Sequence, residues 1–278
     1  MSHKNQKLIL SIFAVLALSS CGLFSKRNAA EQSKKQTAVV EHKKVVSPTP
    51  EPTTVASAEL SIPPPETEKL AVEKKHYEVS TPVIPAETSL RWLKNGNTRF
   101  MKKNFRSDGR TQKDRERLAK GQHPHAIVLA CSDSRVPPEI VFDQTLGEIF
   151  VIRVLGEALD ATVIASIEYA VEHLHTGLLV VMGHSQCGAI QATVKTPEGT
   201  SAGSEYVDKV ISDIRPRLAS MKSEPASLNL EVESTLNADG VARDLVQRSS
   251  LLKNAVESGS LVIKAALYRV DSGKVTFY

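Results

Sequence analysis

Cysteine is scarce in this sequence, in which Cys21, Cys131 and Cys187 are the only three among 278 residues. Three cysteines cannot build a disulfide-based scaffold, so burial of apolar side chains must stabilise any folded core. A long uninterrupted apolar run is also missing, which excludes a protein with several membrane-spanning helices. Neither sign of charge dominates, because 35 basic residues stand against 31 acidic ones. The resulting net charge of +4 gives no reason to expect nucleic acid as a partner.

The first third of the chain has almost no glycine and is rich in proline. Gly22 is the only glycine before Gly96, whereas eight of the fourteen prolines lie within 48–85. Lysine, glutamate, serine and threonine fill much of the rest, and no sustained apolar period is visible. Such a segment buries too little apolar surface to offset the entropy lost on folding. We predict that residues 21–88 form an unfolded, semi-stiff tether with extended polyproline II stretches.

Residues 1–20 resemble an export signal. A positively charged start precedes the apolar run 8–18, which is too short to span a bilayer as a stable helix. The run ends in Leu-Ser-Ser-Cys, which resembles a bacterial lipobox in which Cys21 becomes the lipidated first residue. An ordinary secretory signal with a chance cysteine is the alternative. Because Gly22 follows the cysteine, we predict an exported lipoprotein anchored through Cys21, on the outer membrane and facing the periplasm or the cell surface.

Residues 89–278 alternate between helical and strand-like patterns and form the predicted folded domain. Three short apolar runs are typical of strands buried on both faces of a parallel sheet, namely 126–130, 149–154 and 178–182. A helical pattern capped by Asp160 separates the second run from the third, which predicts a crossover unit. The last residues predict an antiparallel hairpin around 271–273. The predicted fold class is α/β, with a mostly parallel sheet flanked by helices.

Two clusters of chemically active side chains follow two of the predicted strands. Cys131, Asp133 and Arg135 come at the end of the first run, and His184 and Cys187 come at the end of the third. Because the carboxyl ends of parallel strands meet at one edge of a sheet, both clusters lie where a ligand site is expected. Two cysteines and one histidine suit a tetrahedral zinc ion with an open fourth position. Bound there, a water molecule would have its pKa lowered towards neutrality.

Asp133 and Arg135 form a second expected pair. An extended backbone would point the side chains of Cys131, Asp133 and Arg135 to one side. An arginine forks onto a carboxylate and keeps it ionised. Two outcomes stay open: the Asp133 carboxylate accepts a hydrogen bond from zinc-bound water, or it binds zinc as a fourth ligand and closes the site.

Two alternative interpretations of these residues are a disulfide bond and a hydrolase active site. A disulfide between Cys131 and Cys187 would suit an exported chain, although His184 at helix-turn spacing favours zinc. Ser185 lies in a near match to the G-x-S-x-G nucleophile elbow of α/β-hydrolases. That chemistry needs a later histidine, and none follows His184. Four further histidines are expected to be solvated or hydrogen-bonded side chains rather than ligands: His123, His125, His173 and His175.

The paired motifs Cys131-x-Asp133-x-Arg135 and His184-x-x-Cys187 resemble those of the β-class carbonic anhydrases. The similarity extends over 90–278, including the Phe-Val-Ile-Arg run before residue 154 and the closing hairpin. It implies zinc on Cys131, His184 and Cys187, with an Asp133–Arg135 dyad beside the metal. It also implies reversible hydration of carbon dioxide to bicarbonate, and an obligate homodimer that often pairs into a tetramer.

Residues 154–157 depart from the pattern of that family. They read Val-Leu-Gly-Glu, where the family usually has Val or Asn followed by Ala-Gly-Asn. The additional carboxyl group of Glu157 is expected to repel bicarbonate or to shift the pKa of zinc-bound water, and Leu155 is expected to narrow access. This departure motivates an alternative function: a catalytically silent, zinc-binding bicarbonate sensor or assembly protein of the same fold.

Overall fold

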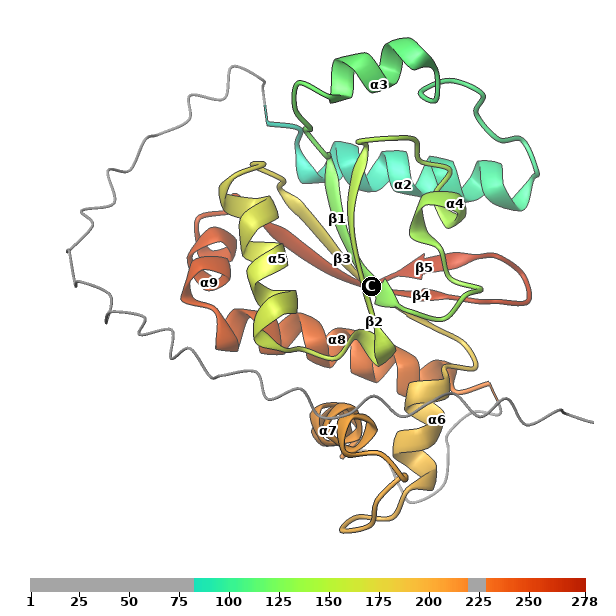
Figure 1. Cartoon of the computed structure of the whole chain (residues 1–278), viewed down its shortest axis with the longest axis vertical. Helices are drawn as coiled ribbons and strands as arrows, with labels where there is room; N and C mark the ends of the chain where they lie inside the picture. The colour runs from blue at the N-terminus through green and yellow to red at the C-terminus, as the bar shows by residue number, and fades with distance from the viewer. Residues whose placement is uncertain (1–82, 220–228) are drawn as a thin grey trace, which may run out of the picture. The chain divides into compact units, whose positions relative to one another are not determined.

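Figure 1 shows the computed structural model of the chain, which describes residues 83–219 and 229–278. The predicted signal sequence, Cys21 and the predicted tether up to residue 82 lie outside the described residues. The first described helix, α2 (Ala86–Met101), precedes a sheet and its covering helices.

A five-stranded sheet forms the centre of the domain. Its strands are β1 (Ala126–Cys131), β2 (Ile149–Val154), β3 (Leu178–His184), β4 (Val262–Tyr268) and β5 (Val275–Phe277). In the order β2-β1-β3-β4-β5, the first four strands are parallel and β5 runs antiparallel to β4. The three predicted apolar runs are β1, β2 and β3, and the predicted hairpin is β4 and β5. The predicted α/β fold class is therefore confirmed.

Helices cover both faces of this sheet (Figure 1). One face carries α5 (Ala161–Glu172), α8 (Glu231–Arg248) and α9 (Ser250–Glu257), and the other carries α2 and α4 (Pro138–Val141). Along β1, Ile127 and Leu129 belong to the first core, whereas Val128 and Ala130 belong to the second. All four are fully buried, which explains why β1 is continuously apolar instead of alternating.

The crossover from β2 to β3 passes through α5, as the sequence predicted. The Asp160 side chain caps this helix, because its Oδ1 accepts the backbone N–H groups of Thr162 and Val163, both at 2.8 Å. These bonds satisfy donors that the first turn of a helix leaves unpaired. The helix ends at Glu172, a little before the predicted end near Gly177.

Short helices lie beyond the carboxyl ends of the parallel strands (Figure 1). They include the 3-10 turn η1 (Leu155–Glu157), α6 (Gly188–Lys195), α7 (Glu205–Ile214) and η2 (Arg215–Leu218), while α3 (Gln112–Leu118) lies in the segment between α2 and β1. Apolar side chains of α6 and α7 pack with Cys131 and Cys187 in a small separate core. Within 83–219 and 229–278, no helix is both long and apolar enough to cross a membrane.

Candidate metal centre

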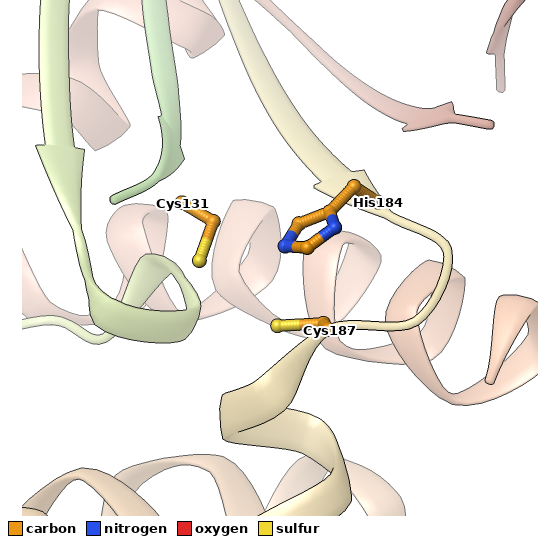
Figure 2. Close-up of side chains that lie close together, drawn as sticks. All are labelled: Cys131, His184 and Cys187. Atoms are coloured by element: carbon orange, nitrogen blue, oxygen red, sulfur yellow. The ribbon is translucent and has the colours of Figure 1, made fainter. Parts of the chain in front are cut away.

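The fold brings Cys131, His184 and Cys187 together at one edge of the sheet. Cys131 ends β1 and His184 ends β3, and these two strands are parallel neighbours. Cys187 is the N-cap residue of α6, which begins after the turn that follows β3. The potential ligand atoms of the three residues all lie within 4.8 Å of one another, and Figure 2 shows the side chains facing a common point. The arrangement is able to hold a metal ion, and both thiols are free of any disulfide.

The imidazole of His184 is oriented by its own backbone neighbour. Its Nδ1 lies 2.9 Å from the carbonyl oxygen of Ser185, and a carbonyl oxygen accepts hydrogen bonds only. Nδ1 therefore donates this hydrogen bond, and Nε2 is the ring nitrogen left to bind a metal ion. This Nε2 is buried and has no hydrogen-bond partner among the described residues. A buried nitrogen left in this way, beside two soft sulfur atoms, fits a zinc ligand set.

The two thiols differ in acidity. A hydrogen bond from the Cys187 thiol lowers the pKa of Cys131 below its ordinary value, and the backbone N–H of Gly156, 3.4 Å from Sγ of Cys131, acts in the same direction. The same thiol–thiol hydrogen bond and burial raise the pKa of Cys187. Cys131 is therefore the more acidic of the two thiols, and metal binding requires both sulfur atoms to lose their protons.

Asp133 and Arg135 form a bidentate ion pair next to this cluster. Arg135 Nε donates to Oδ1 of Asp133 at 2.9 Å, and Nη2 donates to Oδ2 at 2.7 Å. The guanidinium lowers the pKa of Asp133 to about 2, so the carboxylate is ionised at neutral pH. Arg135 Nη2 also donates to the backbone oxygen of Gln186 at 3.3 Å. Arg135 thus connects the loop after β1 with the loop after β3.

The backbone from Cys131 to Arg135 is not extended, and the predicted extended conformation is wrong. The strand ends at Cys131, and the chain turns so that the N–H of Val136 donates to the carbonyl oxygen of Asp133 at 3.0 Å. Oδ1 of Asp133 also accepts the N–H of Arg135 at 2.9 Å. An aspartate that accepts a backbone N–H two residues later stabilises a turn. The ion pair therefore arises from a turn and not from alternation along a strand.

Arg153 supports the same turn, a role that the sequence analysis missed. Its Nε donates to the carbonyl oxygen of Cys131 at 3.1 Å, and its Nη2 donates to that of Asp133 at 2.6 Å. A charged residue inside the apolar strand β2 was the available signal, since a long side chain there needs polar partners.

The two residues that depart from the family pattern have different surroundings. Leu155 is 40% exposed, whereas Glu157 is 1% exposed. Oε2 of Glu157 accepts a hydrogen bond from Nδ2 of Asn237 in α8, at 3.1 Å. Burial raises the pKa of Glu157 well above its ordinary value. The carboxyl group is thus buried against α8, a contact that the sequence analysis did not anticipate.

The remaining candidates have other contacts. Ser185 would be the nucleophile of an α/β-hydrolase. Its Oγ accepts a hydrogen bond from the backbone N–H of Val270 at 3.0 Å. His125 precedes β1, at the opposite end of that strand from Cys131, and its Nε2 lies 2.9 Å from Oε1 of Gln144. Among the described residues, the cluster able to hold a metal contains no histidine other than His184.

Comparison with known proteins identifies the family to which the chain is similar. A family model described as carbonic anhydrase matches residues 126–275, which contain all three clustered residues. Carbonic anhydrase 2 of Mycobacterium tuberculosis is 38% identical over 183 residues, which are 66% of this chain and 87% of that protein.

Solved structures agree with this match. The β-carbonic anhydrase CcaA is 26% identical with a TM-score of 0.55, over 68% of this chain and 94% of that chain. Tetrameric β-carbonic anhydrases from Sordaria macrospora share the fold at 21% identity and a TM-score of 0.54, over 69% of this chain and 96% of that chain. This chain belongs to the β-class carbonic anhydrase family.

Proposed function

We propose that this chain catalyses the reversible hydration of carbon dioxide to bicarbonate and a proton, with zinc held by Cys131, His184 and Cys187. The observation that most supports this proposal is Nε2 of His184, which is buried and unpartnered close to two buried thiols. Those three donors match the protein ligands of a catalytic zinc, which keeps its fourth position open. A zinc ion bound in this way supplies a Lewis acid that makes water a nucleophile near neutral pH.

The residues beside the cluster have distinct roles in this proposal. Asp133 accepts a hydrogen bond from the attacking water. This bond orients the water so that a lone pair of its oxygen points at the carbon of carbon dioxide. Arg135 holds the carboxylate for this task, because it donates to both of its oxygen atoms. This pairing favours an open site over one closed by Asp133 as a fourth ligand, since both carboxylate oxygens already have a partner.

The test is stopped-flow measurement of carbon dioxide hydration by the full chain, loaded with zinc. We expect turnover far above the buffer rate. Hydration at the buffer rate, at neutral and at alkaline pH alike, would contradict the proposal and favour the silent, zinc-binding alternative.

We also propose that the active form is a homodimer or tetramer. The strand β2 lies at an edge of the sheet, and all six of its residues are partly exposed. Exposed apolar side chains lie just outside its two ends, with Leu146 49% and Leu155 40% exposed. An apolar edge strand is usually covered by a partner. Light scattering on the stopped-flow sample measures the mass, and a monomer with full activity would contradict this assembly.

We further propose that lipidated Cys21 anchors the protein to the outer membrane. Cys21→Ala is expected to move the protein from the membrane fraction to the soluble fraction, because cleavage removes the apolar run and the remaining segment is polar. Immunoblotting of fractionated cells measures the distribution. The matched control is Cys187→Ala, which removes a different cysteine and should leave the protein in the membrane fraction. A Cys21→Ala variant that stays with the membrane would indicate another anchor.

A further inference from the structure

The turn η1 has an unusual backbone and a close contact with Cys131, one of the three clustered residues. Gly156 and Glu157 have consecutive positive φ angles of 63° and 52°. A Cβ atom on Gly156 would lie 2.6 Å from Cβ of Ala189 and 2.8 Å from Cδ1 of Ile214, so the turn is pressed against α6 and α7. In this conformation the N–H of Gly156 donates to Sγ of Cys131. A left-handed glutamate is strained, so other contacts must hold it in place.

Asn237 of α8 supplies those contacts. It is fully buried, and its Nδ2 donates to the carbonyl oxygen of Gly156 at 3.0 Å and to Oε2 of Glu157 at 3.1 Å. Its Oδ1 accepts from Nη1 of Arg217 at 3.2 Å. Because an arginine only donates, this bond orients the amide and directs both of its N–H groups at η1.

The network continues to two carboxylates that hold Arg217. Its guanidinium is almost completely buried and pairs with Asp213 at 2.8 Å and with Asp244 at 2.9 Å. A chain of hydrogen bonds thus joins α7, η2 and α8 to the turn that contacts Cys131. Glu157 is a member of this chain, 80 positions from Asn237 in the sequence.

We infer that Glu157 and Asn237 are positioning residues of the metal centre: together they hold the Gly156 N–H on Sγ of Cys131 and so strengthen zinc binding. The inference rests on the proposed zinc function. Neither side chain belongs to the cluster that is able to hold the ion. Their effect passes through one backbone N–H group, and hydrogen bonds to a metal-bound sulfur or its neighbours tune metal affinity.

The test measures zinc affinity of the full chain by competition with a chelating dye. Glu157→Ala removes one of the two acceptors for Asn237, and we expect zinc to bind about 10–100-fold more weakly. Glu157→Gln keeps an oxygen acceptor of the same length, and its affinity should stay close to that of the wild type. Asn237→Ser removes both amide N–H groups that reach η1, and its shorter side chain leaves Glu157 unchanged. It should weaken zinc binding as Glu157→Ala does, and it provides the test if Glu157→Ala fails to fold.

A merely structural role predicts a different pattern. Ile167→Ala is the matched control, because Ile167 lies on α5, is fully buried in the core and is not one of the three clustered residues. This control should lower the melting temperature and leave zinc affinity unchanged. The cobalt-substituted protein provides a second readout, since a displaced Gly156 N–H alters the thiolate-to-cobalt charge-transfer band in Glu157→Ala but not in Ile167→Ala.

Wild-type affinity in both Glu157→Ala and Asn237→Ser would overturn the inference. An equal loss of affinity in Ile167→Ala would do the same, because it would reduce the effect to general destabilisation. A wild-type chain that neither binds zinc nor hydrates carbon dioxide would overturn the proposed function itself. Measuring zinc binding and hydration on the same wild-type sample distinguishes these outcomes.

Discussion

Cys187→Ala is expected to lower the zinc content of the purified chain from about one ion per chain to near zero, because two protein ligands do not make a stable site. Cys187 is 1% exposed at the start of α6. Within the described part of the chain, the cluster contains only Cys131 and His184 besides Cys187. Elemental analysis after dialysis against a chelator measures the loss. Carbon dioxide hydration should fall to the buffer rate in the same sample.

The matched control for this variant is Cys21→Ala, which removes a cysteine far from the cluster in sequence and should retain a full complement of zinc. Circular dichroism checks that both variants are folded. Full zinc occupancy in folded Cys187→Ala would remove Cys187 from the ligand set. Such a result would direct attention to Asp133 as the third protein ligand.

The position of the three clustered residues could be predicted because it depends on the sheet alone. Buried parallel strands have continuous apolar sequences, so β1 and β3 are visible in the sequence with their ends. The carboxyl ends of neighbouring parallel strands then meet at one edge. No knowledge of loops is required to bring Cys131 near His184.

The conformation of the next few residues could not be predicted in the same way. The period-two rule placed Asp133 and Arg135 on one face of an extended segment, but the strand ends at Cys131. Asp133 then accepts the N–H of Arg135 and stabilises a turn. Aspartate is suited to both a strand end and a turn, and the sequence alone does not tell which of the two occurs.

The contacts of Glu157 could not be predicted from the sequence either. The sequence marked Glu157 as a departure from the family pattern, and its charge suggested an effect on bicarbonate. Its hydrogen-bond partner Asn237 lies within α8, a helix whose sequence is polar on average and yet contains several buried polar residues. Pairings between a turn and a distant helix depend on tertiary packing, which no local pattern encodes.

Arg135→Ala is expected to lower kcat/KM for carbon dioxide hydration by about 100-fold while zinc content stays near one ion per chain. Arg135 is not in the cluster that is able to hold the metal, and its two side-chain bonds to Asp133 orient that carboxylate. Without them, the Asp133 carboxylate is free to reorient or to bind zinc, and the attacking water loses its acceptor. Stopped-flow hydration and elemental analysis of the same sample measure both quantities.

The matched control is Arg243→Ala, which removes another arginine paired with an aspartate, on the exposed side of α8 and outside the cluster. It should leave kcat/KM unchanged. In the wild type, Arg135 keeps the pKa of Asp133 at about 2, so Asp133 stays ionised at neutral and at alkaline pH. A rise of wild-type activity with pH in that range therefore reports deprotonation of the attacking water and not of Asp133. Wild-type kcat/KM in Arg135→Ala would contradict the orienting role, and loss of zinc together with activity would make Arg135 part of the metal-holding structure instead.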